Sequence, residues 1–150
     1  MASQVKGANA TLAVTADPAN LVPRGEGSAP QRVAIETYTT AAIDAASTIT
    51  CHAPFPKGAY ITSCNIYYED EASSATLAIG ITANANASTA ITLDDTKFLA
   101  QSAISSGPGI LTANENMNTL IEGSQILLTT AGATLTGSAL LTIVTTYVLK

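Results

Sequence analysis

The sequence predicts an all-β domain, a sandwich or barrel of short strands, and three observations carry the prediction. Apolar and polar residues alternate along several short stretches, as they do in half-buried strands. These stretches recur at roughly 8–12-residue spacing, and segments rich in Gly, Pro, Asn and Ser separate them. Residues 94–101 are the single segment with helical character, so strands dominate the prediction.

The composition fits one domain that is completed by neighbouring subunits. A chain of 150 residues is long enough to bury its own core. Hydrophobic residues make up 47%, but many of them are Ala, aromatics are 5% and Trp is absent, so the core is thin and we expect oligomerisation. Charged residues are 11%, against roughly 25% in ordinary domains, which favours a protein packed into an assembly.

The charge balance and the hydropathy exclude two classes of partner. The net charge is −5 and the six basic residues are scattered, so the chain is not expected to neutralise the phosphates of a nucleic acid. No apolar run approaches the ~18 residues of a membrane helix, and the first residues lack an apolar signal core. Two cysteines are too few for a disulfide framework, so we expect synthesis in a reducing cytoplasm.

Residues 1–30 are predicted to form an extended N-terminal arm, and residues 31–150 the β-domain. Asp17-Pro18, Val22-Pro23 and Ala29-Pro30 oppose a helix, and each Pro lacks the amide that a sheet needs. Two interpretations stay open, a disordered terminus and an arm that orders across a neighbouring subunit on assembly. In the second, the expected interface residues are Leu12, Val14, Leu21, Val22 and Arg24.

The first half of the domain reads as four strands. Residues 32–38 alternate and are rich in β-branched side chains, and a short strand follows at 47–51. Residues 54–58, Pro-Phe-Pro-Lys-Gly, are a turn signal. The strand 60–68 has apolar residues on both faces, so we expect it to be central and covered on both sides. The strand 75–81 follows a short acidic connection, which predicts a hairpin between the two.

The second half is less regular until its last third. Residues 82–89 read as a loop, and residues 90–93 as a short strand or a helical turn. The residues 94–101 are expected to be helical. Strands are then predicted, in order, at 110–111, 119–121, 124–130 and 137–148, with a turn at 131–133.

No candidate catalytic or metal centre emerges. His52 follows Cys51, but neighbouring strand residues point to opposite faces, so this pair is not expected to act as a nucleophile and base. A single histidine also opposes a zinc site. Cys51 and Cys64 are expected to be two buried thiols, with a disulfide as the alternative. The sequence therefore predicts no enzyme, no cofactor and no metal.

The carboxylates gather in two places. Glu69, Asp70 and Glu71 form the densest charge in the chain, and Asp94-Asp95 is a second pair. Such groups can bind calcium, but the spacing of an EF-hand is absent. We expect solvated turn residues, and weak calcium binding stays an alternative.

Several short motifs together resemble a known family. They are Arg32-Val-x-x-x-x-Tyr38, Ala46-Ser-Thr-Ile49, Pro56-Lys-Gly58-Ala, Tyr67-Tyr-Glu69, Thr76-Leu-Ala-Ile-Gly80 and the closing strand from Gly137 to Tyr147. This order resembles small structural proteins of tailed bacteriophages, of the head-decoration or capsid-cement type. The similarity spans residues 32–148, although residues 82–118 carry no matching motif.

The resemblance implies an antiparallel β-sandwich of jelly-roll kind on the outer surface of a phage capsid. The chain would decorate and stabilise the shell by bridging subunits of the major capsid protein, and would bind its own copies, a homotrimer being favoured over a homodimer. The alternative function is a fibre or tail-associated domain that recognises host carbohydrate through exposed aromatic residues. Its candidates are Tyr38, Tyr60, Tyr67 and Tyr68.

Overall fold

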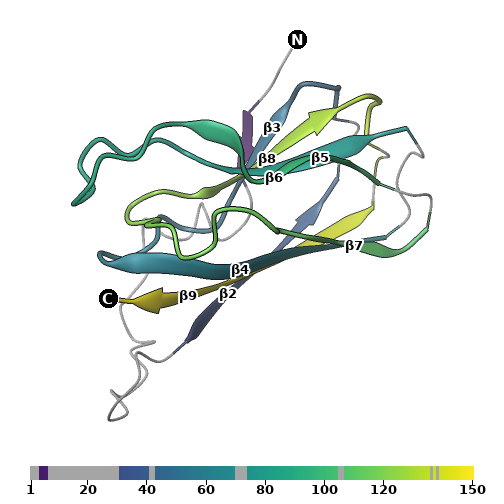
Figure 1. Cartoon of the computed structure of the whole chain (residues 1–150). Helices are drawn as coiled ribbons and strands as arrows, with labels where there is room; N and C mark the ends of the chain where they lie inside the picture. Colours follow the sequence, from purple (N-terminus) through teal and green to yellow (C-terminus); the bar gives the residue numbers. More distant parts are fainter. Residues whose placement is uncertain are drawn as a thin grey trace.

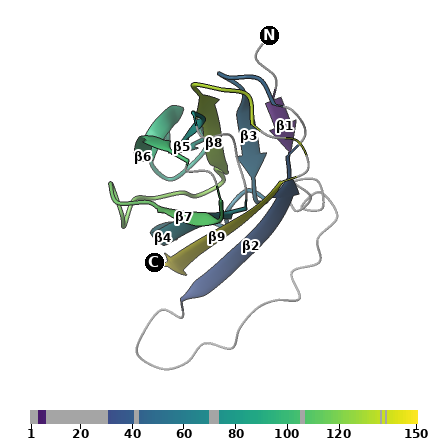
Figure 2. The ribbon, with the colours of Figure 1, turned by 90° about the vertical axis from the view of Figure 1, so that its right-hand side faces the viewer.

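The chain folds into two β-sheets that pack face to face, as Figures 1 and 2 show from two directions. The computed structural model describes residues 31–40, 43–69, 74–104, 107–135, 137 and 139–150, and the backbone of residues 4–6. None of the described residues belongs to a helix long and apolar enough to span a membrane.

In the part of the chain that the structure describes, nine strands make up the two sheets. They are β1 (Gln4–Lys6), β2 (Arg32–Thr39), β3 (Thr48–Cys51), β4 (Ala59–Tyr68), β5 (Thr76–Ile81), β6 (Asp94–Ala103), β7 (Gly109–Thr112), β8 (Ile126–Ala131) and β9 (Leu140–Leu149). One sheet has the order β1-β3-β8-β5-β6 and the other β2-β9-β4-β7. All neighbours are antiparallel except β1 and β3. The predicted all-β sandwich is therefore confirmed.

The strand order is that of a jelly roll. Within the described part of the chain, β5 and β6 are the sole consecutive strands that pair in one sheet, and every other connection from β2 onward crosses between the sheets. Eight strands wound in this way form the double-sheet architecture of jelly rolls. Nearly every strand is thus held by partners that are distant in sequence.

The first strand lies inside the predicted arm. Gln4–Lys6 pairs with Thr48–Thr50 of β3 and adds a parallel edge strand to the five-stranded sheet. The remaining arm residues, and with them the expected interface residues Leu12, Val14, Leu21, Val22 and Arg24, lie outside the described residues. The interface expected in the arm stays a prediction.

The predicted hairpin between residues 60–68 and 75–81 is wrong. Both strands exist, as β4 and β5, but they belong to opposite sheets. Local alternation and a short connection are compatible with either arrangement, and the inward-facing apolar residues of both strands are buried best when the two sheets face each other. The expectation that β4 is covered on both faces is also wrong, because Tyr67 is 43% exposed on its outer side.

The predicted helix at 94–101 is also wrong, since these residues form most of β6. The Asp94 carboxylate accepts a hydrogen bond from the Thr96 amide at 3.1 Å, the contact that a helix N-cap would make. Here it stabilises a local turn instead. Two register shifts between β5 and β6 accommodate the extra residues, because Ile79 faces Leu99 while Ile81 faces Asp94.

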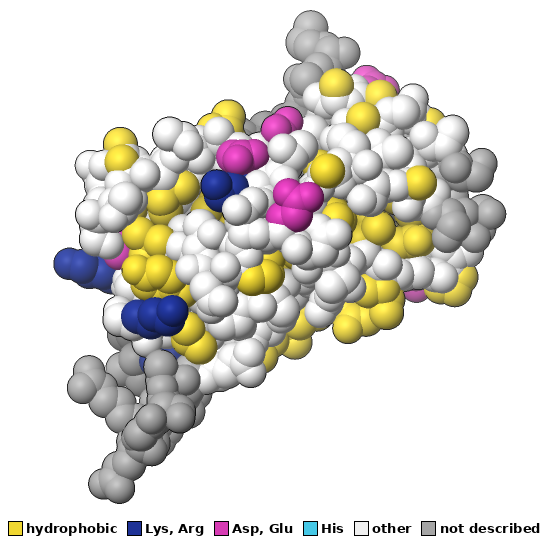
Figure 3. All heavy atoms as spheres, in the orientation of Figure 1, with side chains coloured by type: hydrophobic (Ala, Val, Ile, Leu, Met, Phe, Trp, Pro, Cys, Tyr) yellow, Lys and Arg dark blue, Asp and Glu magenta, His cyan; other side chains and the backbone are white. Residues whose placement is uncertain are grey.

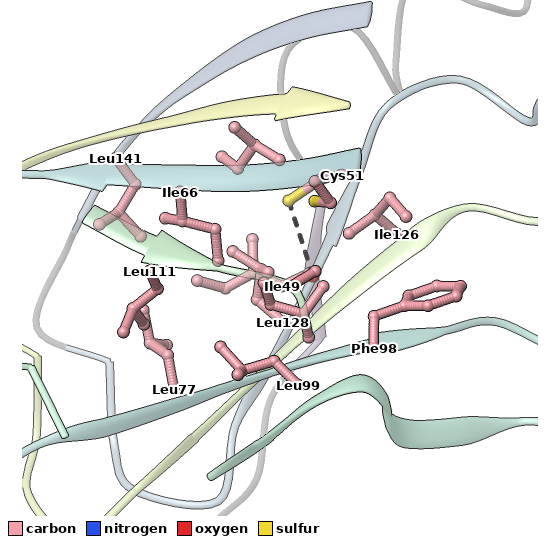
Figure 4. Packing of buried hydrophobic residues seen from close by; sticks show 14 of the residues in the cluster. Ile49, Cys51, Ile66, Leu77, Phe98, Leu99, Leu111, Ile126, Leu128 and Leu141 are labelled. Carbon is pink, nitrogen blue, oxygen red and sulfur yellow. Dashed lines mark hydrogen bonds between the residues drawn. The ribbon is translucent and has the colours of Figure 1, made fainter. Parts of the chain in front are cut away.

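The core is a layer of aliphatic side chains between the sheets. In Figure 4, Leu141 and Ile66 from the four-stranded sheet point toward Leu77 and Leu99 from the other. The largest fully buried side chains are Ile49, Ile61, Ile66, Leu77, Ile79, Ile81, Phe98, Ile104, Ile121, Ile126, Leu128 and Leu135. Burial of such side chains supplies about 1.5–3 kcal/mol each, so isoleucine and leucine compensate for the scarcity of aromatic residues.

One buried polar cluster, formed by Glu36, His52, Cys64 and Thr145, also joins the sheets. His52 follows β3, and its amide donates a hydrogen bond to the carboxylate of Glu36 on β2. Its Nε2 lies 3.0 Å from the hydroxyl oxygen of Thr145 on β9, and that hydroxyl donates to the Cys64 sulfur on β4 at 3.4 Å. We call this group the inter-sheet polar cluster.

The histidine of this cluster is neutral at pH 7. Burial lowers the pKa of His52 to about 4, even though its Nδ1 lies 3.7 Å from the Glu36 carboxylate. The backbone of His52 has a φ of 64°, in the left-handed region, and this conformation directs the residue into the interior immediately after β3.

Gly80→Ala tests whether the close approach of β5 and β6 is essential. A Cβ at position 80 would lie 2.3 Å from the Asp94 carbonyl oxygen and 2.4 Å from the Asp95 Cα, so the strands must separate. We expect a loss of about 1–3 kcal/mol in urea unfolding. Ala100→Ser, at an exposed position of β6, is the control and should change stability by less than about 0.5 kcal/mol. Equal stability of the two variants would contradict this account of the bulged pair.

The pKa of His52 can be measured directly, because His52 is the single histidine of the chain. The ring proton signals of His52 in NMR spectra should titrate with a midpoint near pH 4, because burial disfavours the imidazolium. A midpoint near 6.5, the value of an exposed histidine, would contradict the burial.

The same shift predicts a loss of stability on acidification. Between about pH 6.5 and 4 the unfolded chain takes up a proton that the folded chain does not, so stability falls through this window and is unaffected above it. The full loss is on the order of 3 kcal/mol. His52→Asn tolerates the positive φ and does not titrate, so its unfolding midpoint should depend less on pH in this range.

Candidate functional site

The outward-facing side chains of the four-stranded sheet form a surface without a charged residue, which we call the outer face. Alternation along β2 turns Ala34, Glu36 and Tyr38 toward the other sheet and leaves Val33 and Ile35 outside, 57% and 56% exposed. The outer face consists of Val33, Ile35, Thr37, Thr39, Tyr60, Ser63, Asn65, Tyr67, Ile110, Thr112, Leu140, Thr142, Val144, Thr146 and Val148.

The strand register joins these residues into continuous rows. One row, from β2 to β7, is Ile35, Val144, Asn65 and Thr112. The next is Thr37, Thr142, Tyr67 and Ile110. Side chains directly opposite each other on neighbouring strands contact one another, so the outer face is one surface and not a set of separate residues.

Exposed apolar side chains concentrate on this surface. Among the described residues, the exposed large hydrophobic residues that lie on the outer face are Val33, Ile35, Tyr67, Ile110 and Leu140, and Leu93 is the one that lies elsewhere. In Figure 3 hydrophobic side chains (yellow) gather at the lower right, where Figure 1 places β7, and also at the left beside the basic side chains (dark blue), while most acidic side chains (magenta) lie over the upper sheet. Large exposed apolar patches typically mark interaction sites.

A shallow depression adjoins the outer face at β7. Tyr67, Tyr68, Pro108, Gly109 and Ile110 line it. A Cβ at position 109 would lie 2.2 Å from the Tyr68 hydroxyl oxygen, so any other residue there would require the Tyr68 ring to move. The buried Tyr68 ring therefore fills the space beneath β7 and supports the floor of the depression.

Charges stand at the ends of the outer face. The Glu69 carboxylate accepts a hydrogen bond from the Leu140 amide at 3.3 Å, beyond one end. Near the other end the Lys150 ammonium lies 4.8 Å from the centre of the Tyr60 ring. A charge-free centre with charged residues at its rim is the usual anatomy of a protein–protein interface.

The three residues considered as candidates for catalysis or disulfide bonding, Cys51, His52 and Cys64, contribute to packing in the interior. Cys51 and Cys64 are both buried and free, as expected. Burial raises the pKa of both thiols, that of Cys64 to about 11, so each thiol stays protonated and a poor nucleophile at neutral pH. Cys51 and His52 are both buried, and their contacts differ: the Cys51 thiol donates to the Ile49 carbonyl, whereas the His52 ring lies beside Thr145.

The four candidate tyrosines do not share one aromatic groove, although Tyr67 and Tyr68 both line the depression at β7. Tyr68 is 7% exposed and Tyr38 is partly buried on the inner side of β2. Tyr67 is on the outer face, and the Tyr60 ring is contacted by Lys150. The geometry therefore gives no support to the carbohydrate-binding alternative.

The second acidic pair makes local contacts. Asp94 binds the Thr96 amide and lies 3.9 Å from the Lys97 ammonium. Among the described residues, no three side chains that could ligate a metal come together. Asp70 and Glu71 lie outside the described part of the chain.

Sequence reasoning missed one organising residue, Glu122. Its buried carboxylate accepts hydrogen bonds from the Gly58 amide at 3.0 Å and from the Ser88 amide and hydroxyl at 3.2 and 3.0 Å. The bond from Gly58, followed by those from Ser88 and the charge of Lys57, lowers the pKa of Glu122. The carboxylate joins three loops at one end of the sandwich, and no local pattern around it marks this role.

The fold is shared with chains of two phage capsid structures. One is a chain of the structure described as "Capsid of Ralstonia phage GP4", with a TM-score of 0.69 and 13% identity over 99% of both chains. The other is a chain of "Cyanophage Pam1 capsid asymmetric unit", with a TM-score of 0.53 and 17% identity over 91% of this chain and 99% of that one. At such identities the likeness shows the fold.

No protein-family model matches the sequence, and no curated protein does. Each of the two structural matches covers 99% of the matched capsid chain.

Proposed function

We propose that this chain is a structural protein of a tailed-phage virion, located on the capsid surface, which decorates the capsid and stabilises it by bridging neighbouring subunits of the major capsid protein. The observation that carries the proposal is the end-to-end likeness to a chain of a phage capsid structure. The low charge content and the uncharged outer face support it, because such surfaces suit burial in an assembly.

The fold alone leaves other functions open, since jelly rolls occur in viral capsids, lectins and cupins. The burial of Tyr68 and the partial burial of Tyr38 argue against a lectin-like groove, and the protonated thiols argue against a cysteine nucleophile. A role in attachment requires neither, because its chemistry is the burial of surface against other proteins.

The mechanism would be multivalent attachment. A standard protein–protein interface buries about 1,600 Å² in total. When one subunit binds two shell proteins, the first contact raises the effective concentration of the second binding site, so the second contact forms more readily. Such a bridge stabilises the shell because separating the two shell proteins requires breaking one of the contacts. The arm residues Leu12, Val14, Leu21, Val22 and Arg24 are the proposed contacts with the shell.

Replacing these five arm residues together with Ser tests the arm without removing β1, which a deletion of residues 2–30 would also remove. We expect at least an approximately tenfold loss of binding to capsids from the virus that encodes the chain, because apolar contact area is lost. The measurement is co-sedimentation of the purified chain with capsids that lack it.

Leu93→Ser is the matched control, since Leu93 is 64% exposed and lies outside both the arm and the outer face. It should bind capsids as the unmodified chain does. Equal binding by the five-residue variant would overturn the role of the arm, and absence of the chain from symmetry-averaged density of native particles would overturn the proposed function.

A further inference from the structure

We propose that the outer face is the surface through which two copies of this chain bind each other. This contact goes beyond the proposed capsid function, because it joins identical chains and forms without a shell. It rests on three properties of the outer face: its apolar content, its lack of charge and its dimensions.

The apolar content is abnormal for a sheet face in water. In antiparallel sandwiches the outward positions of each strand are ordinarily polar. Here the outward positions of β2 include Val33 and Ile35, those of β9 include Val144, and β4 and β7 contribute Tyr67 and Ile110. By contrast, β6 at the edge of the other sheet carries Asp94, Asp95 and Lys97.

The lack of charge selects a second copy as the occupant. The chain has a net charge of −5, so two copies repel each other in most relative orientations. The outer face contains no Asp, Glu, Lys or Arg, and two such faces can meet without desolvating a charge or placing like charges together. An acidic protein that binds itself is expected to do so through its uncharged region.

The arrangement of the rows suits two-fold symmetry. The sheet order is β2-β9-β4-β7, and a two-fold axis parallel to the strands places β2 of one copy over β7 of the other. Such an axis keeps each row opposite the same row of the partner, so Ile35 of each copy lies opposite Thr112 of its partner, and Thr37 opposite Ile110. Both partners use the same patch, as in other isologous dimers, so we expect a dimer instead of the trimer that the sequence favours.

The dimensions are sufficient for a modest interface. Strands about 4.8 Å apart and about 3.4 Å per residue make the outer face roughly 19 Å wide and 27 Å long, or about 500 Å² per copy. Two copies thus bury about 1,000 Å² in total, at the lower limit for a specific interface. The dimer should therefore be concentration-dependent.

The test is the mass of the purified full-length chain, measured by sedimentation velocity from about 1 to 500 μM in moderate salt. We expect the mass to rise with concentration from 15.2 kDa toward twice that value. Val33→Glu and Tyr67→Glu should each raise the dimer dissociation constant at least tenfold. Each copy of a two-fold symmetric dimer contributes the same substitution, so two carboxylates are buried in the interface.

Leu93→Glu is the matched control: it also replaces an exposed large hydrophobic residue with a carboxylate, but outside the outer face. It should dimerise nearly as the unmodified chain does, and circular dichroism with thermal unfolding should show that all three variants fold. The control separates the effect of contact from the effect of one more negative charge.

Three results would overturn the inference. They are a monomer at every concentration, a trimer, and a dimer that neither outer-face variant weakens. A monomer whose Val33→Glu and Tyr67→Glu variants lose capsid binding would assign the outer face to the shell instead. Because the dimer is measured without capsids, its failure is distinguishable from failure of the capsid function.

Discussion

The burial of one aliphatic layer between two sheets is the constraint on which the rest of this structure depends. Each sheet has one strongly apolar face, and neither could remain in water with side chains such as Ile66 or Ile79 uncovered. Consecutive strands mostly enter opposite sheets, so both sheets must be in place before either is complete. Long-range pairing of this kind makes folding slow and cooperative, because loop closure precedes most of the stabilising contacts.

The inter-sheet polar cluster adds specificity to that layer. Aliphatic side chains tolerate sliding and repacking, whereas the contacts among Glu36, His52 and Thr145 are satisfied in one relative position of β2, β3 and β9. The positive φ of His52 has a conformational cost, and it is maintained because the residue then reaches both partners. Glu122 has the same effect on the loops at one end.

The two surfaces of the sandwich differ in a way that matters for assembly. The outer face of β2-β9-β4-β7 presents apolar and threonine side chains, while β6 of the other sheet carries charge. In a protein with few charged residues, the location of those charges largely decides which side remains in solvent. The likeness to capsid chains is a likeness of fold, the uncharged outer face is an independent feature of the surface, and the proposed function draws on both.

The sequence by itself determined the class of fold, since alternation of side chains predicted β2, β3, β4, β5, β8 and β9 close to their observed bounds. It also predicted two buried, free thiols, because an unpaired cysteine packs as a small hydrophobic residue. Tertiary structure alone decided the assignment of strands to sheets. Alternation distinguishes the two faces of each strand, but it does not indicate which distant strands will pair with it. Tertiary structure also converted residues 94–101 from helix to strand, since pairing with β5 outweighed a local capping signal. The outer face could not be foreseen either, because its rows join Ile35, Val144, Asn65 and Thr112, which become neighbours only when the register is set.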